Sequence, residues 1–187
     1  MKFKIIFAYL LLGIIIISGC TTNKQPNTTQ EQQKQENQQK QNDTEPNAIT
    51  TASIVNDEEA FLKAVSSEGT WIIAVLRDMT IEEDIVLEGE FIHNDKPERK
   101  IALYSQDENR NITARYTLTA PRLIVKSENA RIQNGTFVGD IYVEANNFSL
   151  VDTKVEGNLY FSSEEYKASS NIDEKSSITG VIEIKQP

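Results

Sequence analysis

The chain has 187 residues, with 19 Lys and Arg against 28 Asp and Glu, and it contains one histidine and one cysteine. The net charge of −9 argues against nucleic acid as a partner, because phosphate binding needs clustered basic side chains. One cysteine excludes an internal disulfide, and no His/Cys cluster predicts a zinc site. We therefore expect no metal and no cofactor.

The first residues form a targeting segment. Lys2 and Lys4 precede an apolar run at positions 5–17, which is too short to span a bilayer as a helix. Small residues then lead into Cys20, a pattern that resembles a bacterial lipobox. The resemblance implies that residues 1–19 are a lipoprotein signal peptide and that Cys20 carries lipid, such as palmitate. The alternative is a plain signal peptide followed by a chance cysteine.

We interpret residues 20–51 as the lipidated cysteine and a disordered linker. Of the thirty residues 21–50, eight are Gln and five are Asn, and such a segment cannot bury a core. Removal of residues 1–19 takes away two lysines and no acid, so 17 basic and 28 acidic side chains remain, a net charge of −11. Attachment to the extracytoplasmic side of a bacterial cell membrane would then rest on the lipid rather than on charge.

A change of composition near Ile54 marks one folded domain, which we place at residues 52–187. Asn56 is the expected N-cap of a short helix that ends at Gly69, with Glu59 completing a capping box. A strand is expected at 70–75, two short pieces at 80–87 closed by Gly89, and a further strand at 101–103, with polar loops at 92–100 and 106–111. The helix would cover the open first layer of the sheets.

An internal repeat with a constant 18-residue period follows. The segments 123–125, 141–143 and 159–161 recur at this spacing, and each alternates as a strand does. A second set of strands predicts that Ile112, Ala130, Phe148 and Tyr166 share one interior column. A third piece ends at Gly139 and Gly157, where a corner is expected.

Three asparagines share the same 18-residue spacing. Asn111, Asn129 and Asn147 each precede a strand of the second set, so we expect their amides to stack as a structural ladder at a corner. The alternative is three ordinary turn asparagines.

This pattern resembles the right-handed parallel β-helix of the pectate-lyase-like superfamily over residues 54–184. The resemblance implies an all-β solenoid with 18-residue coils and a short N-terminal capping helix. That superfamily includes polysaccharide lyases and hydrolases, and also adhesins and modules without catalysis.

Nothing in the sequence identifies a reaction. Cys20 is assigned to lipid, and His93, the only histidine, lies in an expected loop. Carboxylates are abundant, but we expect a solvated acidic surface and assign no catalytic residue. Non-catalytic function is therefore favoured over an enzyme.

One outward column of the repeat is apolar. Ala102, Ile124, Tyr142 and Tyr160 are expected to share it, and tyrosine offers a flat apolar body with a polar rim. Ile124, Tyr142 and Tyr160 are thus the expected ligand-binding residues. The alternative is that a loop covers the column or that tyrosine stacking stabilises the sheet.

The preferred function is a surface-anchored lipoprotein that presents a binding or scaffolding face in the cell envelope. Its partner would be an envelope polysaccharide or an envelope protein. The alternative is a small pectate-lyase-like polysaccharide lyase or glycoside hydrolase. Converging carboxylates in a cleft would favour the enzyme, and a flat face with stacked tyrosines would favour the binding protein.

Overall fold

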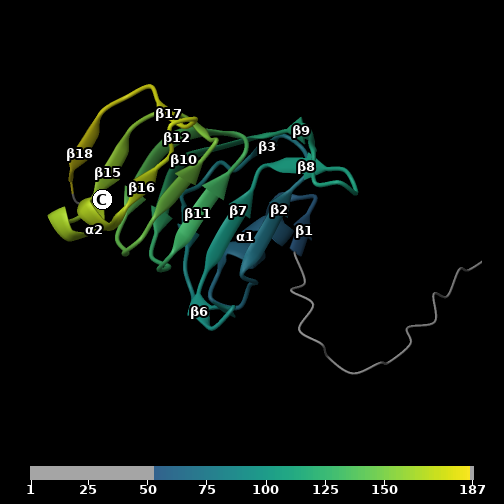
Figure 1. Cartoon of the computed structure of the whole chain (residues 1–187), viewed down its shortest axis with the longest axis horizontal. Coiled ribbons are helices and arrows are strands. Elements are labelled where there is room, and N and C mark those ends of the chain that lie inside the picture. The colour runs from purple at the N-terminus through teal and green to yellow at the C-terminus, as the bar shows by residue number, and fades with distance from the viewer. Residues whose placement is uncertain (1–52, 186–187) are drawn as a thin grey trace, which may run out of the picture. The chain divides into compact units, whose positions relative to one another are not determined.

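The computed structural model describes residues 53–185, which lie within one compact unit, Glu45–Pro187. This part is mostly β, with two short helices and two large parallel sheets (Figure 1). Neither helix in residues 53–185 is long and apolar enough to cross a membrane. The predicted signal peptide, the lipid on Cys20 and the linker lie outside the described residues.

The first large sheet has six parallel strands. In sheet order they are β1 (Ser53–Val55), β2 (Ile72–Val75), β7 (Arg99–Ala102), β11 (Ala130–Gln133), β13 (Ser149–Val151) and β16 (Asn171–Ile172). Ile73, Ile101, Ile132 and Leu150 are paired partners along this order and all are buried. The predicted strand 101–103 therefore belongs to this sheet, next to Ile132, and not to the sheet that contains Leu123.

The second large sheet has eight strands. They are β3 (Met79–Thr80), β4 (Ile85–Leu87), β10 (Thr117–Val125), β12 (Thr136–Val143), β14 (Lys154–Glu156), β15 (Leu159–Phe161), β17 (Ser177–Ile178) and β18 (Ile182–Ile184). Leu123 pairs with Ile141, which pairs with Leu159, so the 18-residue spacing is confirmed as strand register. All three side chains are buried, as period-two alternation predicts.

The glycine corner is also confirmed. Gly139 has φ of +135°, a left-handed backbone that L side chains rarely adopt, and a Cβ there would lie 1.9 Å from Ala120 O. At Gly157 the reason is close approach instead, because a Cβ would lie 2.0 Å from Gly139 O. Consecutive layers of the second sheet therefore touch backbone to backbone at this corner.

The predicted helix is present as α1 (Glu58–Val65), but Asn56 is not its cap. Asp57 is the N-cap, and its carboxylate accepts a hydrogen bond from Ala60 N at 2.8 Å. Phe61, Ala64 and Val65 are buried where α1 packs against β1, β2 and β4. The helix thus covers one end of both large sheets.

Two antiparallel hairpins replace the predicted polar loops. They are β5–β6 (Ile92–His93 and Lys96–Pro97) and β8–β9 (Tyr104–Gln106 and Ile112–Arg115). Ile112 is 39% exposed in the second hairpin, so its predicted place in the interior column is wrong. Asn111 is likewise no part of an asparagine stack, because its backbone and amide bond to Asp107 within that hairpin.

The last repeat differs through an inserted helix, α2 (Glu164–Ser169). Tyr166 lies in α2, only partly buried, and Phe148 and Ala130 alone remain from the predicted column of four. Before the insertion, Val143 pairs with Phe161, and the two residues are separated by the repeat length. After it, Leu150 pairs with Ile172, and the longer segment between these two residues contains α2. The helix therefore holds most of the extra length. The loop at 173–177 adds one further residue before Val155 pairs with Ile178.

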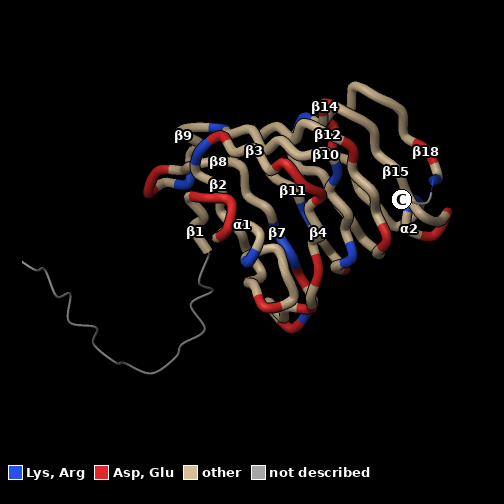
Figure 2. The backbone as a smooth tube through the Cα atoms, turned by 180° about the vertical axis from the view of Figure 1, so that it is seen from behind, with Lys and Arg blue, Asp and Glu red and all other residues tan. Residues whose placement is uncertain are grey.

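That loop is itself ordered by hydrogen bonds. The carboxylate of Asp173 accepts from Asp152 N at 3.1 Å and from the Ser176 hydroxyl at 2.6 Å. The Ser176 hydrogen bond in particular lowers the pKa of Asp173 below its ordinary value. Acidic residues cluster on α1, α2 and such loops, while the strands carry few of them (Figure 2).

Candidate functional site

The predicted tyrosine stripe exists, with different members. Ile124, Tyr142 and Tyr160 are neighbours in one column, which continues to Val86 on one side and Glu183 on the other. Ala102 is not part of it, because it pairs with Gln133 in the other sheet. The column is therefore real, but it is not an exposed aromatic face.

Tyr142 and Tyr160 are 6% and 7% exposed. Their ring centroids lie 4.8 Å apart at 38°. The Arg122 guanidinium lies over the Tyr142 ring at 5.9 Å, and the Lys185 ammonium lies over the Tyr160 ring at 4.5 Å. Little ring surface remains for a ligand, and the geometry favours stacking that stabilises the sheet.

Replacement of both tyrosines by alanine is therefore expected to destabilise the protein by about 3 kcal/mol or more, from lost burial and lost stacking. The measurement is urea unfolding followed by circular dichroism. Tyr142→Phe with Tyr160→Phe keeps both rings and is the matched control, with an expected change near zero. Unchanged stability of the alanine variant would restore the stripe as a candidate binding surface.

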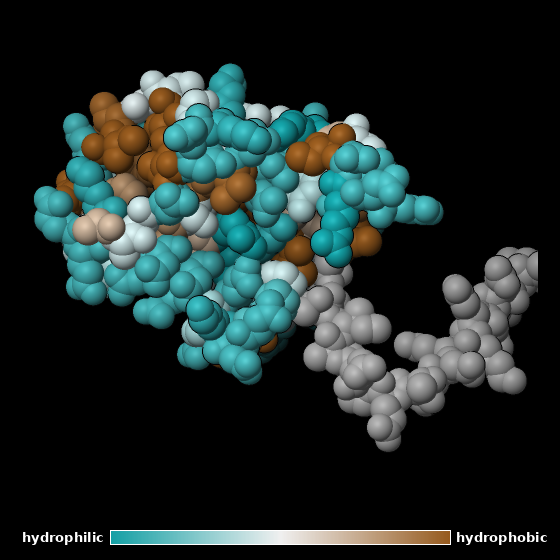
Figure 3. Space-filling view, viewed as in Figure 1, coloured by the Kyte–Doolittle hydropathy of each residue, from teal (hydrophilic) through white to brown (hydrophobic). Residues whose placement is uncertain are grey.

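A more open site lies where the β5–β6 hairpin meets the outward face of β11 and β13. We name it the hairpin groove. It encloses about 420 Å³ and is lined by His93, Asn94, Lys96, Pro97, Glu98, Asn129, Arg131, Asn147 and Ser149. Figure 3 shows hydrophilic surface over this hairpin. All but Pro97 carry polar or charged side chains, so the groove suits a ligand with many hydrogen-bonding groups.

Glu98 holds the hairpin against the sheet. Its Oε1 accepts from Arg131 Nη2 at 2.5 Å, and its Oε2 lies 2.7 Å from His93 Nδ1. Arg131 points outward because its neighbours in β11, Ala130 and Ile132, are both buried inward. The wall of the groove is therefore a fixed chain of three side chains from two distant segments.

The His93 ring also stacks on the Trp71 ring, with the ring centroids 3.8 Å apart and an angle of 8° between the ring planes. Two nitrogens beside this chain, Trp71 Nε1 and Arg131 Nε, are buried without a hydrogen-bond acceptor among the described residues. Each such donor costs about 1–3 kcal/mol. Arg99 Nε, which does not line the groove, is a third such donor, so these nitrogens do not by themselves assign a role to the groove.

Asn129 and Asn147 form the floor at the ends of the adjacent strands. Both have a left-handed backbone, with φ of 53° and 60°, a conformation that Asn tolerates better than most residues. They precede Arg131 and Ser149, which are paired across β11 and β13. No hydrogen bond joins their two amides in residues 53–185, so the structure does not show the predicted ladder and instead presents both amides to the groove.

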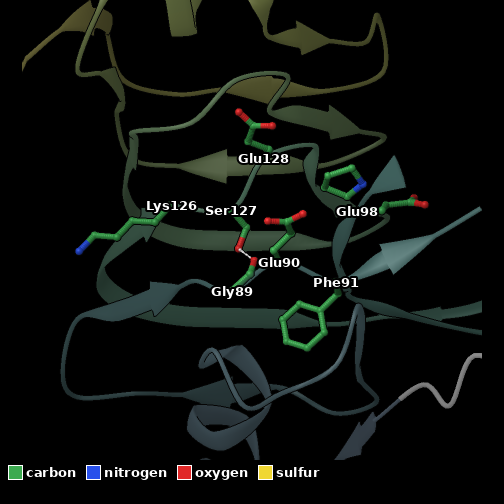
Figure 4. A pocket seen from close by; sticks show the side chains of 8 residues that line it. Gly89, Glu90, Phe91, Glu98, Lys126, Ser127 and Glu128 are labelled. Carbon is green, nitrogen blue, oxygen red and sulfur yellow. Dashed lines mark hydrogen bonds between the residues drawn. The ribbon is translucent and has the colours of Figure 1, made fainter. Parts of the chain in front are cut away.

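A second, smaller cavity of about 210 Å³ lies on the other side of β6 (Figure 4). Glu90, Glu98 and Glu128 line it, together with Lys126 and Ser127. In Figure 4 the Glu98 and Glu128 carboxylates point in different directions, and Lys126 points away from them. Within residues 53–185, no group of three His, Cys, Asp or Glu side chains is placed to hold a metal ion.

Hydrolysis of a glycosidic bond commonly needs two carboxyl groups about 5–9.5 Å apart across the substrate. The hairpin groove has one, Glu98, and both its oxygens are engaged by His93 and Arg131. The groove can therefore bind and orient hydroxyl groups, but its lining supplies no free acid and base pair.

Sequence reasoning missed this site. The sequence placed His93 in an expected polar loop and did not single out Arg131, whereas the structure joins the two through Glu98 beside the β5–β6 hairpin. The signal that was available is Asn129 and Asn147, 18 residues apart, each followed two residues later by an outward polar side chain, Arg131 or Ser149. No family model, curated protein or solved structure matches the chain.

Proposed function

We propose that this protein is a lipid-anchored, non-catalytic envelope protein whose hairpin groove binds a polysaccharide. The observation that carries the proposal is the groove itself, in which amides, a hydroxyl and cations line an open hollow on a rigid sheet. Such groups hydrogen-bond sugar hydroxyls in either direction. Lys96 and Arg131 outnumber the single carboxylate, so acidic sugars are the favoured class.

The fold that we propose is a right-handed parallel β-helix of the pectate-lyase-like kind. Its support is the 18-residue register that runs from residues 122–125 of β10 through β12 to β15, with a second large parallel sheet whose strands β11 and β13 also pair 18 residues apart. The helix α1 would cap the first coil, as its contacts with β1, β2 and β4 suggest. Such a stack holds side chains of successive coils about 4.8 Å apart, a spacing suited to an extended ligand.

The groove is tested with the chain from residue 21 onward, which carries no lipid, first on a glycan array and then by calorimetry with any sugar that binds. Asn147→Gly with Ser149→Ala is expected to weaken binding about tenfold, or about 1.4 kcal/mol, without altering the unfolding midpoint. Glycine keeps the left-handed backbone of Asn147 and removes only the amide.

Asn134→Gly is the matched control, because Asn134 has φ of 62° at the opposite end of β11, outside the groove. It should bind as the unaltered chain does. Absence of binding to every sugar on the array, or equal weakening by the control, would overturn the assignment of the groove.

The second candidate function is a polysaccharide lyase or hydrolase. The cavity lined by Glu90, Glu98 and Glu128 is the observation that favours it. Product analysis of each bound glycan separates the two functions. Turnover that is abolished by Glu90→Gln or Glu128→Gln would establish the enzyme, whereas binding without any product supports the first function.

Anchoring is tested separately on Cys20, which lies outside the described residues. Cys20→Ala is expected to release the protein from the membrane fraction or to leave an uncleaved precursor, because the chain has no other cysteine to carry the lipid. Labelling with a radioactive fatty acid should mark the unaltered protein and not the variant. An unlabelled wild-type protein would contradict the anchor.

A further inference from the structure

One end of the eight-stranded sheet is open. The strand β18 pairs with β15 on one side and has no strand on its other side in residues 53–185. Val181, Ile182 and Ile184 are 45%, 42% and 40% exposed there. Hydrophobic residues gather at this end of the molecule in Figure 3, over the region that Figure 1 labels β15, β17 and β18. An open, apolar edge of this kind is a template for another strand.

The opposite end of the eight-stranded sheet is covered by a helix, whereas Ile54 on the edge strand β1 of the six-stranded sheet is exposed. There α1 packs against β1, β2 and β4 and buries Phe61, Ala64 and Val65. The helix α2, by contrast, buries none of its residues and packs against β15. The two ends of the eight-stranded sheet therefore differ, because α1 covers one end and the edge strand β18 is left exposed at the other.

The hydrogen bonds between β15 and β18 show which backbone groups of β18 remain available to pair with another strand. Leu159 N donates to Val181 O at 2.9 Å, and Lys185 N donates to Phe161 O at 2.9 Å. Successive residues of a strand direct their N–H and C=O groups to opposite sides, so Val181, Glu183 and Lys185 face β15. The N–H and C=O groups of Ile182 and Ile184 face the open side.

We propose that β18 pairs antiparallel with β18 of a second copy of this chain, with Ile184 directly opposite Ile184. This register joins two residues whose backbone groups are both free, and they form the hydrogen-bonded pair that an antiparallel ladder requires. It also places Glu183 of each copy opposite Lys185 of the other. Both side chains are exposed, so two ion pairs form across the symmetry axis.

The charge pattern selects this register over its neighbour. Centring the pair on Glu183 would place Glu183 opposite Glu183, and directly opposed like charges are destabilising. Of these two registers, only the one centred on Ile184 places opposite charges of the Ile-Glu-Ile-Lys segment across from each other. Ile184, which pairs with the buried Phe161 of β15, would meet its counterpart and extend the apolar core across the axis.

The strand is three residues long, so backbone pairing alone makes a small contact and the dimer should be weak and concentration-dependent. Sedimentation of the chain from residue 21 onward should show a monomer–dimer equilibrium at concentrations up to about 1 mM. Glu183→Lys alone should weaken the dimer at least about threefold, and Glu183→Lys with Lys185→Glu should restore it. The double swap Lys154→Glu with Glu156→Lys, in an exposed ion pair on β14, is the control and should leave it unchanged.

Cysteine substitution tests the register directly, because the chain from residue 21 contains no cysteine. Ile184→Cys should form a disulfide-linked dimer under mild oxidation, since directly opposite Cα atoms lie about 5.5 Å apart, within reach of a disulfide. Val181→Cys is as exposed but would lie about 20 Å from its counterpart, and it should not cross-link.

A monomer at all concentrations overturns the proposal. So does equal cross-linking of Ile184→Cys and Val181→Cys, which would indicate random collision, or preferential cross-linking of Glu183→Cys, which would indicate the other register. A wild-type dimer in which Ile184→Cys stays unlinked would place the contact elsewhere on the surface. Circular dichroism of each variant shows that it is folded.

Discussion

Phe148→Ala is expected to lower the free energy of unfolding by about 3–5 kcal/mol. Phe148 is 1% exposed and belongs to the hydrophobic core between the two large sheets. Its backbone oxygen accepts from Asn171 N at 2.8 Å, which fixes the residue beside the last strand of the six-stranded sheet. Removal of the ring leaves a cavity that its close-packed neighbours can fill only in part.

Urea unfolding measures this loss, and Ile112→Ala is its matched control. The repeat places Ile112 and Phe148 in the same column, whereas the structure buries Phe148 and leaves Ile112 39% exposed in the β8–β9 hairpin. The control should therefore cost less than about 1 kcal/mol. Comparable losses at the two positions would show that the repeat, and not the structure, assigns the column correctly.

Arg99→Met is expected to cost about 3–5 kcal/mol, because it leaves buried oxygens without their donor. Arg99 is 1% exposed. Its guanidinium donates to Ala64 O at 2.9 Å, Ser66 O at 2.8 Å and Thr70 O at 2.5 Å. These oxygens lie at and beyond the C-terminal end of α1, where a helix has carbonyls without internal partners and where a cation is favourable.

Burial lowers the pKa of Arg99 to about 10, and the nearby Glu88 carboxylate opposes that shift. The guanidinium therefore stays charged at neutral pH and is stabilised by its three carbonyl acceptors and by the Phe91 ring, 4.0 Å away. Methionine keeps an unbranched apolar stem but is shorter than arginine and donates no hydrogen bond. Fluorescence-detected urea unfolding at pH 7 gives the cost.

Arg122→Met is the control for Arg99. Arg122 pairs with Asp84 at the surface, with 42% and 31% of the two side chains exposed, and an exposed pair contributes about 0.2–1 kcal/mol. A loss at Arg99 no larger than that at Arg122 would mean that water replaces the guanidinium at the three carbonyls. Arg122 lies beside Asp140, 18 residues along the chain, in the strand register, but its ion pair forms with Asp84 instead.

The repeat was the most accurate part of the sequence prediction, because it depends only on the local geometry of each strand. Alternation at Leu123–Val125 and its equivalents follows from strand geometry, and identical spacing puts equivalent residues in register. The same reasoning failed at Ile112 and Tyr166, because an apolar residue at the right spacing does not reveal that a hairpin or a helix has replaced the strand. Ile112 in the β8–β9 hairpin and Tyr166 in α2 both keep the 18-residue spacing to Ala130 and Phe148, although neither lies in a strand of the six-stranded sheet.

The candidate site could not be predicted from the sequence, for a different reason. His93 and Glu98 come from the β5–β6 hairpin and the residue after it, Arg131 from β11, and Trp71 from the residue before β2. Their proximity is set by how the hairpin folds back over the six-stranded sheet, and no spacing along the chain encodes that. The tyrosine stripe shows the converse, since the column was predicted and its burial was not.

The sequence by itself determined which side chains face inward along β10, β12 and β15, the parallel 18-residue register of these strands and the presence of a helix ahead of them, because these follow from local periodicity and capping. Only the tertiary structure decided the partner of Arg122, the burial of Arg99 and of the two tyrosines, and the assembly of the hairpin groove. Each of these depends on contacts between segments that are distant along the chain, and such contacts are set by how whole elements pack against one another.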